Sequence, residues 1–111
     1  MSTIEYKTGD VDDLGAKLEE NGTGIDLDGF TVELILKDTN DTRIVVSCTL
    51  GGTVSGVDVL SSEGGVTAHF TADSTATAGI YHAEFVATIG DNVIHIPSGN
   101  NYITVTIWEA L

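Results

Sequence analysis

The chain has 111 residues, which is enough for one domain of ordinary size, and we expect residues 1–111 to form a single domain. Hydrophobic residues make up 41% of the chain and there is only one proline, so the composition excludes a disordered or proline-rich segment. The apolar runs are too short to cross a bilayer, and a single cysteine, Cys48, excludes an internal disulfide.

The net charge is the most unusual property of the chain. Seventeen Asp and Glu oppose four Lys and Arg, which gives a formal net charge of −13. Binding to phosphates or to an anionic membrane surface requires clustered cations, so we expect no nucleic-acid partner and no membrane partner. The acidity is consistent with cation binding, with a neutral or basic protein partner, or with adaptation to molar salt. We favour salt adaptation, because lysine is scarce and carboxylate repulsion is largely screened at about 1 M salt.

The first half of the chain predicts a β-hairpin preceded by shorter elements. Thr3–Lys7 is expected to form a strand, and Leu14–Glu20 is expected to form either a strand or a short helix. Apolar and polar residues alternate along Phe30–Lys37 and again along Arg43–Leu50, and a polar turn separates the two runs. Cys48 falls on the inward phase of the second run, so we interpret it as apolar filler rather than as a nucleophile.

The second half of the chain continues the alternating pattern. Residues 51–65 form a loop rich in glycine and serine, with room for a short edge strand at Val57–Leu60. Four further strands are expected, at Val66–Phe70, Ile80–Ile89, Val93–Ile96 and Tyr102–Trp108. About seven to eight short strands without helix-length segments between them predict an all-β, immunoglobulin-like antiparallel β-sandwich.

One connection carries a more specific pattern than alternation. The segment Asp73–Tyr81 resembles the corner at which immunoglobulin-type domains cross between their two sheets. In that motif the tyrosine ring fills the core, and its hydroxyl caps an upstream backbone carbonyl. We therefore expect Asp73 and Tyr81 to be structural corner residues, with an ordinary strand tyrosine as the alternative.

Several short segments resemble one known family. They are Glu20–Gly22, Ile25–Val32, Gly65–Asp73, Ala78–Phe85, Asp91–Pro97 and Tyr102–Val105. Together they resemble the N-terminal immunoglobulin-like domain of phage baseplate upper proteins, over roughly residues 5 to 107. Gly24 stands where that family often has proline. We also expect a lone module, with no fibre or receptor-binding domain behind it.

The resemblance implies a function in a virus particle. It implies a non-enzymatic structural protein of a tailed virus, located in the virion at the tail or baseplate, with other virion proteins as partners. A capsid decoration or turret protein of the virus head is the alternative, because a lone module could serve at either place. Combined with the acidity, the resemblance indicates a virus whose host is halophilic.

Three aromatic residues near the ends of the terminal strands are candidate interface residues: Tyr6, Tyr102 and Trp108. Trp108 shares its phase with the polar residues of its strand rather than with the apolar ones, which favours a protein contact over a place in the core. The alternative is that Trp108 folds over the rim of its own sandwich. We expect contacts through Thr3–Lys7, Tyr102–Trp108 and the loop 51–65. Exposed strand edges also predict a homo-oligomer, in which a ring closes the interface.

Calcium binding is the main chemical alternative. The acidic turns Asp10–Asp13, Asp26–Gly29 and Asp38–Asp41 offer oxygen ligands, which would suit a calcium-dependent adhesion or carbohydrate-binding module. None of these turns completes the twelve-residue calcium loop, and Asp and Asn favour turns for backbone reasons alone.

The remaining candidate residues predict neither a metal site nor catalysis. The histidines His69, His82 and His95 fall on the outward phase of their strands, and no two have a recognised ligand spacing in one element. No nucleophile-elbow, phosphate-loop or dinucleotide motif is present in the sequence. We therefore expect no metal, no cofactor and no catalytic residue.

The net charge leads to a prediction about salt. Closely spaced carboxylates repel one another until they are screened, so the isolated domain should gain melting temperature when sodium chloride rises from about 0.1 M to 2 M. Thermal unfolding followed by circular dichroism measures this. A melting temperature that stays constant or falls would contradict salt adaptation.

Overall fold

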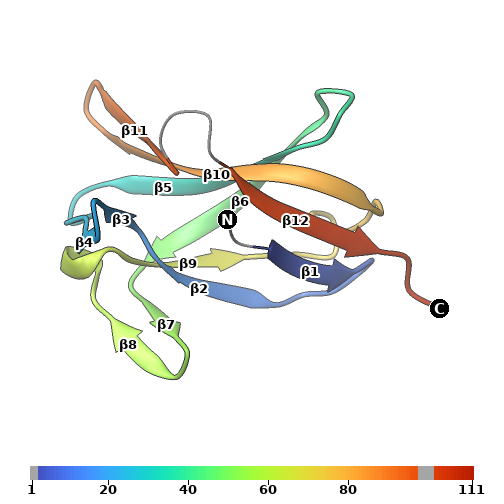
Figure 1. The fold of residues 1–111 in the computed structure, drawn as a ribbon, viewed down its shortest axis with the longest axis horizontal. Coiled ribbons are helices and arrows are strands. Elements are labelled where there is room, and N and C mark those ends of the chain that lie inside the picture. The colour runs from blue at the N-terminus through green and yellow to red at the C-terminus, as the bar shows by residue number, and fades with distance from the viewer. Residues whose placement is uncertain (1–2, 98–101) are drawn as a thin grey trace.

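The computed structural model describes residues 3–97 and 102–111, and β-strands dominate it (Figure 1). The elements are β1 (Thr3–Lys7), β2 (Asp13–Lys17), β3 (Glu19–Glu20), β4 (Thr23–Gly24), β5 (Thr31–Lys37), β6 (Arg43–Leu50), β7 (Gly52–Val54), β8 (Val57–Val59), the 3-10 turn η1 (Ser61–Glu63), β9 (Gly65–His69), β10 (Gly79–Ile89), β11 (Asn92–Ile96) and β12 (Ile103–Trp108). Leu14–Glu20, which was ambiguous in the sequence, is therefore extended. Among the described residues, no helix is long and apolar enough to span a membrane.

The main strands form one curled sheet in the order β1-β12-β10-β5-β6-β9-β2, and β11 also pairs with β10. Strand β6 turns the sheet over on itself. Its residues 43–47 pair with β5, whereas its residues 48–50 pair with β9. As a result β9 and β2 form a second layer beneath β5 and β10 (Figure 1). The predicted all-β, sandwich-like fold is confirmed.

One strand pair departs from the antiparallel prediction. Strand β1 pairs in parallel with β12, with Ile4 opposite Val105 and Tyr6 opposite Ile107. The two strands come from opposite ends of the chain, so no short turn dictates their relative direction. The pairing places Ile4 and Tyr6 on the inward side, where Tyr6 is buried and Ile4 packs against the core.

Alternation along the strands builds the core. In β10 the residues Tyr81, Ala83, Phe85 and Ala87 are buried, and the residues between them face outward. Strands β5, β9 and β12 show the same period of two. Cys48 of β6 packs against this core, and burial raises the pKa of its thiol to about 12.

The loop 51–65 is more ordered than its composition suggests. It contains the hairpin of β7 and β8, followed by η1. Strand β7 lies against β2 at Gly15, where an added Cβ would come within 1.9 Å of the Thr53 carbonyl oxygen. A residue without a side chain is therefore needed at this position for the hairpin to dock.

The connection between β9 and β10 is fixed by buried hydroxyl groups. Thr75 is fully buried, and its hydroxyl donates to the Asp10 carbonyl at 2.8 Å. The Ser74 hydroxyl donates to the Thr71 carbonyl at 2.9 Å and accepts from the Thr71 N–H at 2.7 Å. The Thr75 bond ties the crossing to the connection between β1 and β2, and the Ser74 bonds fix the crossing itself.

The Tyr81 hydroxyl donates to the Thr77 carbonyl at 2.9 Å. This is the bond that the corner motif predicts, and the Tyr81 ring is buried. Asp73 contributes through its backbone instead of its side chain. Its carbonyl accepts a bond from the Ala76 N–H at 3.4 Å.

The Tyr81 bond can be tested by removing one oxygen. Tyr81→Phe keeps the ring but leaves the Thr77 carbonyl without its donor, so the free energy of unfolding should fall by about 1 to 3 kcal/mol. Urea unfolding measures the change. Tyr6→Phe is the matched control, because the described part of the chain gives that hydroxyl no hydrogen-bond partner, and it should change stability by less than about 0.5 kcal/mol. Equal losses in the two variants would contradict the role of the corner bond.

Candidate interaction surface

The side of the larger layer that faces away from the core is open to solvent. We call it the outer face. It is formed by Glu5 and Lys7 of β1, Thr104, Thr106 and Trp108 of β12, Ile80, His82 and Glu84 of β10, Ile35 and Lys37 of β5, and Arg43 and Val45 of β6. Strand register sets these side chains in rows across the strands.

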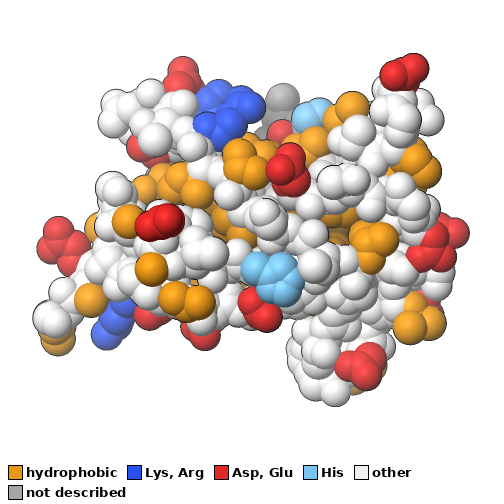
Figure 2. Space-filling view, turned by 180° about the vertical axis from the view of Figure 1, so that it is seen from behind, with side chains coloured by type: hydrophobic (Ala, Val, Ile, Leu, Met, Phe, Trp, Pro, Cys, Tyr) orange, Lys and Arg blue, Asp and Glu red, His pale blue; other side chains and the backbone are white. Residues whose placement is uncertain are grey.

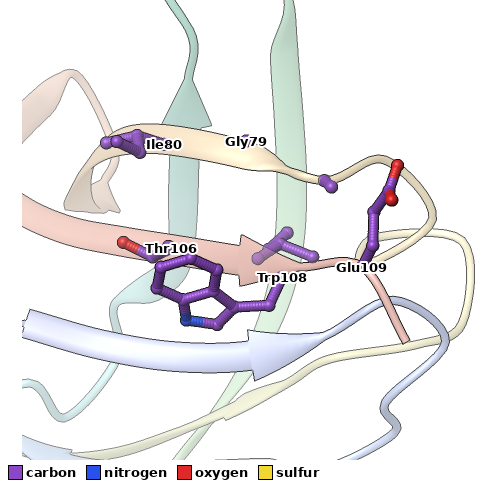
Figure 3. A pocket seen from close by; sticks show the side chains of 7 residues that line it. Gly79, Ile80, Thr106, Trp108 and Glu109 are labelled. Atoms are coloured by element: carbon purple, nitrogen blue, oxygen red, sulfur yellow. The ribbon is translucent and has the colours of Figure 1, made fainter. Parts of the chain in front are cut away.

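The apolar part of the outer face surrounds Ile80 and Trp108. Their side chains are 62% and 55% exposed. Ala78, Thr106 and Glu109 help them to line an open groove of about 510 Å³. Figure 3 shows the Trp108 ring lying along β12 toward Thr106, with Ile80 on the neighbouring strand. A groove with an exposed indole on one side can receive an apolar side chain of a partner.

The indole of Trp108 is held in this orientation by a neighbouring strand. Its Nε1–H donates to the Glu5 carboxylate at 3.2 Å. Glu5 belongs to β1 and lies opposite Thr106, one row away from Trp108. The ring therefore lies on the outer face and does not fold into the rim of its own core.

A second row on the outer face is basic. Register places His82 opposite Lys37, and Lys37 opposite Arg43, so three donor side chains form one line across β10, β5 and β6. Lys37 also pairs with Asp41 at 3.2 Å. Arg43 makes no ion pair with any residue that the structure describes. Figure 2 shows a patch of basic side chains at the upper edge of the molecule, with hydrophobic side chains beside it.

The two parts of the outer face adjoin each other. A second groove, of about 460 Å³, is lined by Ile80, His82 and the hairpin residues Lys37, Thr39 and Asp41, among others. Ile80 lines both grooves, so they lie on either side of it. The outer face thus sets the apolar side chains of Ile80 and Trp108 beside the basic row, and the carboxylates of Asp38, Asp41 and Glu109 also line the two grooves. Such a mixture of apolar and charged groups suits a protein contact.

The structure separates the three aromatic residues that the sequence proposed for an interface. Trp108 is exposed on the outer face. Tyr102 is half-buried and stacks on His82, with ring centroids 3.7 Å apart. Tyr6 is buried in the core against Phe70, with ring centroids 4.4 Å apart, because it lies on the inward phase of β1. We therefore remove Tyr6 from the candidate interface.

The terminal strands also differ in what they offer to a partner. Strand β12 lies between β1 and β10, so neighbours occupy both of its edges and only its outward side chains are accessible. Strand β1 is the edge strand. Its Lys7 N–H is already bonded to the Asp10 carboxylate at 2.8 Å, which closes this end of the edge to strand addition.

The acidic turns use their carboxylates to fix the backbone. Asp26 accepts from the Asp28 N–H at 3.0 Å, and Asp38 accepts from the N–H groups of Asn40 and Thr42, each at 2.9 Å. Such bonds explain the Asp residues as turn formers. Over residues 3–97 and 102–111, no group of three His, Cys, Asp or Glu side chains is arranged to hold a metal ion.

The histidines form local pairs on separate strands. His95 Nδ1 lies 2.9 Å from the Glu84 carboxylate. His69 Nδ1 lies 2.8 Å from Asp13, and its Nε2 lies 2.8 Å from the Thr49 hydroxyl. Sequence reasoning missed this carboxylate–imidazole–hydroxyl array, because its members come from β2, β9 and β6 and only the strand register brings them together. It joins three strands of the second layer.

A solved structure with a similar fold is the N-terminal domain of phage TP901-1 ORF48. The likeness has a TM-score of 0.60 with 14% sequence identity, and it covers 97% of this chain and 84% of that chain. No protein-family model matches the chain, and no curated protein matches it in sequence. The likeness shows a shared fold along almost the whole chain.

The different places of Tyr6 and Trp108 lead to opposite expectations for truncation. Tyr6→Ala opens a cavity in the core and should lower the free energy of unfolding by roughly 3 to 5 kcal/mol. Trp108→Ala removes an exposed ring and should cost less than about 1 kcal/mol. Denaturant unfolding of both variants provides the measurement. A large loss of unfolding free energy for Trp108→Ala would show that this ring stabilises its own domain, which would contradict its place in the candidate interface.

Proposed function

We propose that this chain is a non-enzymatic structural component of a tailed-virus particle, and that it contacts neighbouring virion proteins through the outer face. The observation that carries the proposal is the similarity of almost the whole fold to the N-terminal domain of a phage protein, which supports a structural role in phage. The short segments that resemble the N-terminal domain of phage baseplate upper proteins support the same proposal.

The outer face supplies the physical means of attachment. Trp108 and Ile80 are large apolar side chains that remain exposed beside a groove. Exposed aromatic residues of this kind are enriched among the residues that carry binding energy. The tail or baseplate is the proposed location, and the virus head is the alternative.

Labelling of particles tests the proposal. Antibodies raised against the purified domain should decorate virus particles, purified from the virus that encodes this chain, at one end of the tail in immunogold electron microscopy. Decoration of the head would support the decoration or turret alternative. Particles that are free of the chain by both labelling and mass spectrometry would refute a virion role, and particles of an unrelated phage serve as the control.

A further inference from the structure

We propose that the outer face binds the acidic segment Asp10–Asp13 of a second copy of this chain, so that copies associate head to tail. This inference rests on the proposed structural function and names one partner of the outer face.

The basic row is only partly neutralised in a single copy, because Asp41 pairs with Lys37 at 3.2 Å whereas Arg43 has no ion pair among the described residues. Lys37 and Arg43 lie directly opposite each other on β5 and β6, and like charges in this position destabilise a strand pair. The chain has four Lys and Arg in total, and three of them, Lys7, Lys37 and Arg43, are on the outer face. The fourth, Lys17, is on β2 and lies 3.7 Å from Glu19. An anionic partner would relieve the repulsion within the row.

Asp10–Asp13 has the complementary composition. It contains three carboxylates around Val11, which is 66% exposed. Burial, and after it the negative charges of Asp12, Asp10 and Asp13, raise the pKa of Tyr6 to about 12. Asp10 caps the Lys7 N–H and Asp13 contacts His69, which leaves Asp12 and the Val11 side chain for a partner.

The two surfaces are complementary, because in each of them an apolar part lies next to a charged part. Val11 can enter the groove beside Ile80 and Trp108, and the carboxylate of the adjacent Asp12 then faces the basic row. The apolar contact supplies binding energy, whereas the charges select the orientation. Ile80 and Lys37 both line the second groove, together with Asp38 and Asp41, so that in the described part of the chain Arg43 is the cation of the row without a carboxylate of its own copy beside it.

Backbone hydrogen bonds hold the segment in place. The Asp10 carbonyl accepts from Thr75, and the Asp12 carbonyl accepts from the Phe70 N–H at 3.1 Å, so the segment is fixed beside the end of β9 in the other layer. Different surfaces therefore meet, and the interface is heterologous. Such contacts form a ring when the rotation closes and a filament when it does not.

Charge reversal of each surface tests the interaction. Lys37→Glu with Arg43→Glu makes the outer face acidic, and Asp12→Lys with Asp13→Lys makes the segment basic while Val11 keeps its apolar side chain. Each double variant alone should raise the apparent dissociation constant of self-association by about tenfold or more. An equimolar mixture should associate again, because each reversed surface then meets its reversed partner. Sedimentation velocity at about 0.1 M salt, with protein up to about 1 mM, gives the distribution of species.

Controls separate this effect from general charge and from misfolding. Lys17→Glu and Glu20→Lys change charge on exposed residues away from both surfaces, so they should leave self-association unchanged. Circular dichroism melting should show that all variants fold.

Two outcomes would overturn the inference: a wild-type chain that remains an 11.6 kDa monomer throughout, or association that the double variants do not weaken. A monomer that is nevertheless found in virus particles would refute only this inference. Association of a chain that is absent from particles would refute only the proposed function.

Discussion

The structure depends on burying every second residue of β10 between the two layers. Tyr81, Ala83, Phe85 and Ala87 fill the core, and a shift of one residue would bury His82 and Glu84 in their place. A buried aromatic or aliphatic side chain contributes roughly 1.5 to 3 kcal/mol, whereas an unpaired buried charge opposes folding, so the register is strongly specified. The same register determines which side chains form the outer face.

Closure of the sheet then separates the two charged surfaces. Strand β6 passes from the first layer to the second, and the buried hydroxyl of Thr75 anchors the connection that follows β1. The basic row therefore lies on one layer, whereas the segment Asp10–Asp13 leads from β1 of that layer to β2 of the other.

Local pattern predicted most of the strands and their inward residues, because alternation and turn residues are properties of neighbouring positions in the chain. It also predicted the Tyr81 bond, which spans only four residues. It did not predict the parallel pairing of β1 with β12 or the inward place of Tyr6, since both depend on which distant strand is chosen as neighbour. The row of His82, Lys37 and Arg43 required a register across three strands. Each residue was visible in the sequence as polar and outward, but their alignment was not.

The strong negative charge and the small basic row have a joint consequence for association. Copies of a chain with a net charge of −13 repel each other in nearly every orientation. An orientation that sets Lys37 and Arg43 against carboxylates is the exception, because attraction there replaces repulsion. Specificity is a difference between the favoured arrangement and its competitors, and the acidic surface raises the free energy of those competitors. A few cations in one row can thus select an orientation, whereas the same cations scattered over the surface would select none.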